Sequence, residues 1–140
     1  MEALVALFIM ALASSVIVLT MPPRPSPIDA QSDKLENLAE IARQTALVKG
    51  VWAGLFLADD KIHIVTYRRG SWVAARGKPA RLEGRVSLAD NRDESDDEVP
   101  IAYFGPTGTA KPVRLLLDVE RSERVLSISY DGELVWENSN

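Results

Sequence analysis

The 140-residue sequence contains no cysteine and a single histidine, His63. The absence of thiols excludes a disulfide framework, a cysteine-ligated zinc site and a thiol nucleophile. His63 lies in a strand-like run, out of phase with Ile62 and Ile64, which favours a solvent-facing or locally hydrogen-bonded strand histidine. No nucleophile with a base, glycine-rich phosphate loop or metal-ligand spacing accompanies it. We therefore expect no enzymatic activity and no cofactor.

The sequence also lacks an excess of basic residues. It has 16 lysines and arginines against 20 acids, which gives a formal net charge of −4. Proteins that bind phosphate backbones usually carry a basic surplus, so the net charge argues against nucleic acid as a general partner.

One local cluster of cations departs from this balance. Its members alternate with Tyr67 and Trp72, and because cations meet phosphates and aromatic rings stack on bases, the cluster is the candidate for contact with DNA or another partner. Neutralisation by neighbouring acids within the molecule is the alternative interpretation. The cluster consists of Arg68, Arg69, Arg76, Lys78, Arg81 and Arg85.

An acidic stretch follows the basic cluster. Carboxylates can gather around calcium, but the spacing does not match an EF-hand loop and no glycine supplies its sharp turn. We interpret the stretch as a solvated loop, with calcium binding as the alternative. The acids are Asp90, Asp93, Glu94, Asp96, Asp97 and Glu98.

Charge is missing altogether between Glu2 and Arg24. Within this interval, Ala3 to Met21 is an apolar run interrupted only by three hydroxyl residues, close to the ~20 residues that a helix needs to cross a bilayer. We predict a transmembrane helix over residues 1–21. A cleavable signal peptide fits less well because the start is acidic and the run is long. A buried soluble helix would need protein on every side.

The remainder predicts one domain over residues 33–140, joined to the span by a proline-rich connector, 22–32. Asp33 and Glu36 have the spacing of a capping box, and apolar residues recur with helical period as far as a stop at Gly50. These features predict an amphipathic helix from Asp33 to Lys49.

Strand signals dominate the rest of the chain. Two runs around Asp59-Asp60 predict a hairpin, and Asp131-Gly132 predicts a two-residue hairpin turn near the C-terminus. The stretch from Ser71 to Ala89 is less regular. The expected class is α+β, with a helix packed on antiparallel sheets. The predicted strands are Val51–Ala58, Lys61–Arg68, Arg85–Leu88, Pro100–Phe104, Val113–Val119, Val125–Tyr130 and Glu133–Trp136.

The order of these features resembles the type IV pilin superfamily, and more narrowly the GspH/FimT-type minor pseudopilins of type II secretion. The resemblance starts with the apolar Glu-Ala-Leu-Val-Ala-Leu segment at Glu2 and the amphipathic helix after it. It continues with a strand ending in Phe104, a Pro-x-Gly turn at Pro106–Gly108, an apolar strand over Arg114–Val119 and the closing hairpin over Val125–Val135.

The resemblance implies a pilin-like fold and a structural role at the tip of a pseudopilus that supports protein export across the outer membrane. It implies a single-pass protein of the bacterial inner membrane, with its C-terminal domain in the periplasm and with other minor and major pseudopilins as partners. It also implies that Glu2 pairs with the N-terminal amine of a neighbouring subunit, a buried ion pair that sets register more than it adds stability.

Family precursors carry a basic leader ending in Gly before an aromatic residue, whereas this sequence starts at Met1-Glu2. We expect the true start to lie upstream, where a prepilin peptidase would act, and methylation would follow from the same resemblance. Two alternatives stay open. One is a minor type IV pilin with a role in DNA binding or uptake, and the other is a bitopic envelope protein whose small β domain binds an unrelated partner.

Overall fold

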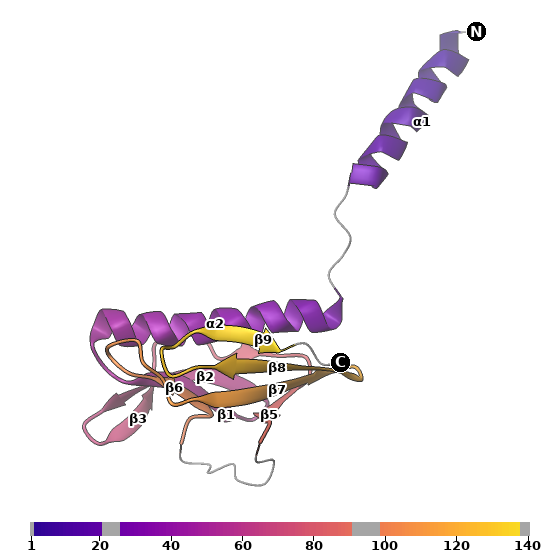
Figure 1. Ribbon diagram of the computed structural model, residues 1–140. Helices are drawn as coiled ribbons and strands as arrows, with labels where there is room; N and C mark the ends of the chain where they lie inside the picture. The colour runs from indigo at the N-terminus through magenta and orange to yellow at the C-terminus, as the bar shows by residue number, and fades with distance from the viewer. Residues whose placement is uncertain (1, 21–25, 91–98, 138–140) are drawn as a thin grey trace.

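The computed structural model describes residues 2–20, 26–90 and 99–137, and within the first helix it describes side chains as far as residue 13. Two helices precede the strands, and Figure 1 shows α1 apart from a body in which α2 lies along the sheets. The elements are α1 (Glu2–Thr20), α2 (Pro27–Lys49), β1 (Ala53–Ala58), β2 (Lys61–Arg68), β3 (Ser71–Ala74), β4 (Ala80–Arg81), β5 (Arg85–Leu88), β6 (Ala102–Phe104), β7 (Val113–Val119), β8 (Ser122–Ile128) and β9 (Leu134–Glu137).

The strands form two antiparallel sheets. Sheet A has the order β3-β2-β1-β6, with β4 pairing with the other end of β2, and sheet B has the order β5-β7-β8-β9. The predicted α+β class, with a helix on antiparallel sheets, is confirmed. Sheet A joins segments far apart in the chain, since β6 pairs with β1 through Phe104 and Ala53.

Three hairpins close through two-residue turns in which both residues have positive φ: Asp59-Asp60, Arg69-Gly70 and Glu120-Arg121. Such turns match the twist of the strands that they join. The turn at Asp59-Asp60 was predicted. Glu120-Arg121 contains no glycine, asparagine or aspartate, so the sequence did not signal it, and β8 begins at Ser122 rather than at the predicted Val125.

The last hairpin differs from the prediction. Ser129 N–H donates to the Glu133 carbonyl at 3.0 Å and Gly132 N–H donates to the Ser129 carbonyl at 2.9 Å, so the loop contains three residues, Tyr130 to Gly132. Gly132 has φ +82°. The predicted two-residue turn is therefore wrong, because the glycine occupies the left-handed position that ends a three-residue loop.

Helix α2 begins earlier than predicted. Ser26 is its N-cap, with the hydroxyl accepting from Asp29 N–H, and Pro27 occupies the first turn. Proline is favoured there because it has no N–H to leave unsatisfied. The prediction of a helix starting at Asp33 is wrong, and the predicted connector 22–32 overlaps the helix from residue 27; residues 22–25 lie outside the described part. The predicted end is confirmed, since Gly50 caps the helix with φ +63°.

Strands β3 and β4 lie in the stretch predicted to be irregular. Both are short and lie at the edge of sheet A, where β2 alone supplies their partners. Strand residues at an edge need little burial, so these strands lacked the apolar pattern from which the longer ones were predicted.

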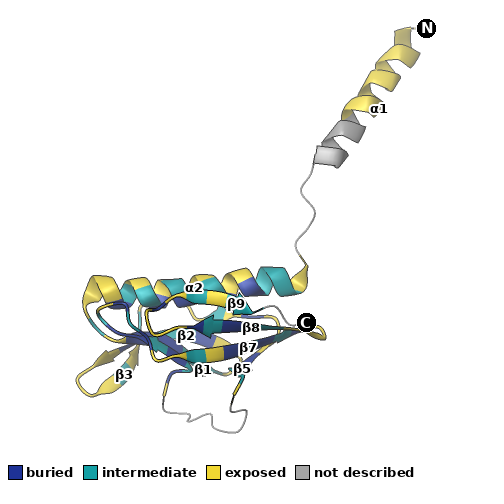
Figure 2. Cartoon of the chain, in the orientation of Figure 1, coloured by how far each residue is buried: buried dark blue, intermediate teal, exposed yellow. Residues whose placement is uncertain are grey.

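The core lies between α2 and the two sheets. The buried stripe of α2 is mostly alanine, which allows the helix backbone to approach the strands closely, and α2 contacts β1, β6, β7 and β8. Figure 2 shows this buried layer beneath the helix. The fully buried residues of the stripe are Leu35, Ala39, Ala42 and Ala46, opposite Leu55, Phe104, Leu115, Leu117 and Leu126.

Candidate functional site

The first candidate for a functional site is the exposed apolar surface of α1. Consecutive apolar side chains are exposed along it, among them Leu7 at 63%, Phe8 at 66% and Ile9 at 60%. Successive residues of a helix lie 100° apart, so exposure at consecutive positions means that apolar surface faces every direction. Burying each such side chain is worth about 2 kcal/mol. The described residues outside α1 therefore leave these apolar side chains exposed (Figure 2).

Among the helices and side chains that the structure describes, none is long and apolar enough to cross a membrane. The predicted span over residues 1–21 includes residue 1, the side chains of 14–20 and residue 21, which lie outside that part. The transmembrane helix therefore stays a prediction.

Glu2 lies in the first turn of α1 and is exposed. An acid at this position interacts favourably with the positive end of the helix dipole. Its pairing with the amine of a neighbouring subunit stays a prediction.

The six cations of the basic cluster are all exposed, but the fold divides them. Arg68 lies opposite Ser71 at one end of β2, and Arg81 lies opposite Lys61 at the other end. β2 has eight residues, and the seven steps between its ends span about 23 Å.

The remaining cations lie elsewhere again. Arg76 and Lys78 line a shallow groove between the segment joining β3 to β4 and α2. Arg69 lies in the β2–β3 turn, whereas Arg85 lies in β5 of sheet B. The cluster seen in the sequence is therefore not one continuous surface.

Only Asp90 of the predicted acidic loop is described; Asp93, Glu94, Asp96, Asp97 and Glu98 lie outside the described residues. Asp90 accepts from Arg114 at 2.8 Å, and Glu137 accepts from the same guanidinium at 2.6 Å. Hydrogen bonds from Arg114 lower the pKa of Glu137. In turn, the hydrogen bonds to Glu137 and Asp90 raise the pKa of Arg114. Within the described chain, no three acids or histidines are grouped so that they could hold a metal.

The start of α2 is fastened to sheet B. Asp29 forms an ion pair with Arg124 of β8, and the hydrogen bond from the Ser26 hydroxyl, then that from Arg124, lowers the pKa of Asp29. Farther along the helix, Trp136 of β9 donates from Nε1 to Glu36 at 3.1 Å. These contacts fix α2 across the strands of sheet B.

His63 lies in β2 opposite Phe56 and is half-buried. Its strand position agrees with the prediction, and the cross-strand neighbour is aromatic rather than a nucleophile or a carboxylate.

The sequence did not reveal an aromatic cluster on sheet A. Trp72 lies 5.3 Å from Tyr67 and 6.0 Å from Tyr103, which in turn lies 5.8 Å from Trp52, measured between ring centroids. Tyr67 and Trp72 lie opposite each other in the β2–β3 hairpin, so their contact could have been predicted from the sequence once that hairpin was recognised. Tyr103 comes from β6, about thirty residues later in the chain, so only the sheet topology brings it to the same place.

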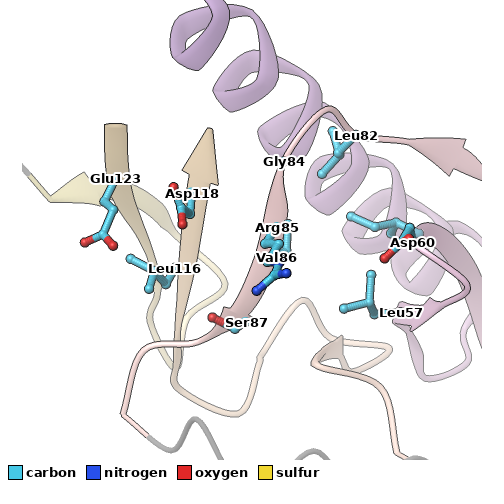
Figure 3. A pocket seen from close by; sticks show the side chains of 11 residues that line it. Leu57, Asp60, Leu82, Gly84, Arg85, Val86, Ser87, Leu116, Asp118 and Glu123 are labelled. Atoms are coloured by element: carbon cyan, nitrogen blue, oxygen red, sulfur yellow. The ribbon is translucent and has the colours of Figure 1, made fainter. Parts of the chain in front are cut away.

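The sequence also gave no sign of a groove of about 370 Å³ between the two sheets. We call it the β5 groove. One wall comes from the tip of the β1–β2 hairpin and the segment before β5; the other comes from the outer face of sheet B (Figure 3). Its charged and apolar lining includes Leu57, Asp60, Leu82, Arg85, Asp118 and Glu123.

The two glycine turns that carry the sequence resemblance meet in space. Ala110, just after the Pro106–Gly108 turn, donates from its N–H to the carbonyl of Tyr130 in the β8–β9 loop at 2.9 Å. Gly108 also lies against Leu47 of α2. These turns form one end of the domain, beneath the C-terminal half of α2.

Comparison with solved structures identifies relatives of this fold. The minor pseudopilin EpsH from the type 2 secretion system of Vibrio cholerae superposes with a TM-score of 0.57 at 13% identity, covering 79% of this chain and 94% of EpsH. The type IV minor pilin FimU of Pseudomonas aeruginosa superposes with a TM-score of 0.58 at 19% identity, covering 78% of this chain and 87% of FimU. No family model matches the sequence, and a comparison with curated proteins finds no match. The resemblance inferred from the sequence is confirmed at the level of the fold: the chain has the pilin-like fold of minor pseudopilins and minor pilins.

Proposed function

We propose that this protein is a minor pseudopilin, a structural subunit of a pseudopilus tip that supports protein export by type II secretion. The observation that carries the proposal is the combination of α1, whose described side chains present apolar surface in every direction, with an α+β domain of the pilin-like fold. Such a protein acts by packing against other subunits rather than by catalysing a reaction.

In the proposed cycle, α1 is first held in the inner membrane, with the α+β domain that begins at α2 in the periplasm, and then packs among the helices of other pilin-like subunits. Both environments bury its apolar side chains, so the helix can pass from one to the other without exposing them to water. Glu2 would become costly when buried alone, and a cationic partner on the neighbouring subunit offsets that cost.

Two measurements on the full chain test this proposal. The protein is expected in the membrane fraction, resistant to alkaline extraction. Because the sequence has no cysteine, the variant Leu7→Cys introduces a single thiol into α1, and it should form disulfide-linked products with pilin-like subunits carrying a thiol in the same helix. Arg121→Cys in the β7–β8 turn is the matched control and should not. A fully soluble protein, or equal cross-linking of both variants, would refute the proposal.

Glu2→Gln separates anchoring from assembly. The variant keeps the apolar helix, so it should remain in the membrane fraction, but it loses the charge that pairs between subunits. We expect cross-linking through Leu7→Cys to decrease severalfold in the double variant. Unchanged cross-linking would remove Glu2 from the assembly interface.

A minor type IV pilin is the second candidate, and the likeness to FimU favours it equally. A DNA role within that candidate receives no support from the dispersed cations. In a gel-shift assay at physiological salt we expect no complex with duplex DNA. A shift that disappears when Arg68 and Arg69 are both replaced by serine would reinstate the DNA role.

A further inference from the structure

The aromatic cluster lies on the face of sheet A that points away from α2. Leu55 of β1 is buried in the core that α2 shares, and successive strand residues point to opposite faces, so Gly54 faces outward. Tyr103 and Val65 both lie opposite Gly54 in the neighbouring strands. Tyr67 follows Val65 by two residues and therefore shares its face, with Trp72 opposite. The cluster consists of Trp52, Tyr67, Trp72 and Tyr103.

The rings of the cluster are available for contact. Trp52 and Tyr67 are each 42% exposed, and Trp72 and Tyr103 are half-buried. No described residue forms a hydrogen bond with the indole N–H groups or the phenolic hydroxyls of the cluster. Rings with an apolar body and a free polar group are suited to the boundary between an apolar phase and water.

The charged residues of sheet A all have one sign. Its strands, which are described in full, contain no acid; their charged residues are Lys61, Arg68 and Arg81. Arg68 lies beside Tyr67 at the aromatic end of β2, and Arg69 follows in the turn. Both are exposed, and no described acid pairs with either guanidinium. This end of sheet A therefore fits a surface that is anionic outside and apolar beneath.

The proposed span brings such a surface within reach. α1 ends at Thr20 and the N-cap of α2 is Ser26, and a chain of that length spans at most about 20 Å. A bilayer that holds α1 is therefore close to the domain, and this high effective concentration favours even a weak contact.

From the position, exposure and charge of the aromatic cluster we infer that, before assembly, the outward face of sheet A docks on the anionic surface of the bilayer that holds α1. The inference rests on the proposed function, because it requires α1 in the membrane. Tryptophan and tyrosine rings enter the interfacial layer, and Arg68 and Arg69 meet lipid phosphates.

Docking fixes the orientation of the domain. Figure 1 shows β3 at the end of α2 that is farther from α1. The 23 residues of α2 extend for about 35 Å, so the aromatic cluster reaches the bilayer only when α2 lies along it. Sheet A then lies between α2 and the lipid, and the outer side of α2 stays free for other subunits.

The three tryptophans of the chain provide an internal probe. Trp136→Phe leaves Trp52 and Trp72, both in the cluster, whereas the matched control, Trp52→Phe with Trp72→Phe, leaves only Trp136 in β9 of sheet B. Each full chain is reconstituted in vesicles of equal parts phosphatidylcholine and phosphatidylglycerol, with acyl chains brominated to quench tryptophan on contact. Trp52 and Trp72 should be quenched and Trp136 should not. Equal quenching of the two variants would overturn the inference.

The role of charge is tested in the Trp136→Phe chain. Quenching should be weaker in brominated phosphatidylcholine alone, and Arg68→Gln with Arg69→Gln should lower the ratio of docked to free domain about tenfold in the anionic vesicles. The matched control, Arg76→Gln with Lys78→Gln, removes the same charge beside the groove that faces α2 and should change nothing. Equal losses in both variants, or quenching that ignores lipid charge, would count against docking on anionic lipid.

Flotation of the same vesicles separates this inference from the proposed function. A chain that does not float with the lipid is not anchored by α1, and both proposals then fail. A chain that floats while Trp52 and Trp72 stay unquenched is anchored, but its aromatic cluster does not contact lipid. That result overturns the docking alone and leaves the cluster to a protein partner.

Discussion

Gly132 lies against the carbonyl oxygen of Gly108, so close that a Cβ atom at position 132 would overlap it. The two glycines belong to turns separated by two strands, β7 and β8, and each has positive φ, +82° for Gly132 and +85° for Gly108. The contact joins the turn after β6 to the turn before β9, and so connects sheet A with sheet B at one end of the domain.

Gly132→Ala should therefore destabilise the domain for two reasons, backbone strain at a positive φ and overlap of the added Cβ with Gly108. We expect a loss of about 3 kcal/mol in the free energy of unfolding. Gly70→Ala is the matched control, because Gly70 has φ +83° but open space around its Cβ position. It should cost about 1 kcal/mol from strain alone. Urea unfolding followed by tryptophan fluorescence measures both; equal losses would contradict the contact.

The close packing of α2 gives a second prediction. Ala42 is fully buried against the sheets, whereas Ile41, beside it in the sequence, is 50% exposed. Ala42→Leu adds volume where the helix approaches the strands and should cost about 2 kcal/mol. Ile41→Leu should change stability by less than about 0.5 kcal/mol. The same urea titration compares them, and a tolerated leucine at position 42 would show that the helix can move away from the sheets.

Acid pH should weaken the attachment of α2 to sheet B. The pKa of Asp29 is lowered from its ordinary value of 3.8 by the Ser26 hydroxyl and by Arg124. A lowered pKa means that the folded state prefers the ionised form, so the contribution to stability is complete above the ordinary value and is lost as pH falls through the lower, folded value. The loss should occur below about pH 4.

Asp29→Asn should flatten this part of the stability curve, measured by urea unfolding between pH 2 and pH 6. Ser26→Ala removes the first of the two partners and should give an intermediate slope. The pKa values of Asp131 and Glu137 are also lowered, by the Ser129 hydroxyl and by Arg114, so part of the slope should persist. A slope unchanged by Asp29→Asn would contradict the assignment.

A charge in the middle of α1 should impair anchoring. Leu12→Arg places a guanidinium near the centre of the proposed span, at a cost of about 3 kcal/mol for insertion. We expect a measurable share of the variant to leave the membrane fraction. Val48→Arg adds the same charge at an exposed position of α2 and should not change the distribution. Equal redistribution by both variants would show that net charge, rather than the span, controls it.

The sequence alone was sufficient to predict those elements that depend on a local pattern of residues. The apolar run of α1, the stop of α2 at Gly50 and the hairpin at Asp59-Asp60 all follow from neighbouring residues, because helices, caps and tight turns are local. The start of α2 was missed because Pro27 was grouped with the connector prolines, although a helix N-terminus accepts proline.

Only the tertiary structure determined which side chains lie together on the surface. The six cations are near one another in the chain, but β2 separates Arg68 from Arg81 by its whole length, and Arg85 joins the other sheet. Conversely, Tyr103 contacts Trp72, and Asp60 and Asp118 line one groove, only because strands distant in sequence meet in space. Local pattern specifies each element, whereas the pairing of strands across long loops depends on the burial of the whole core, which no short stretch of sequence determines.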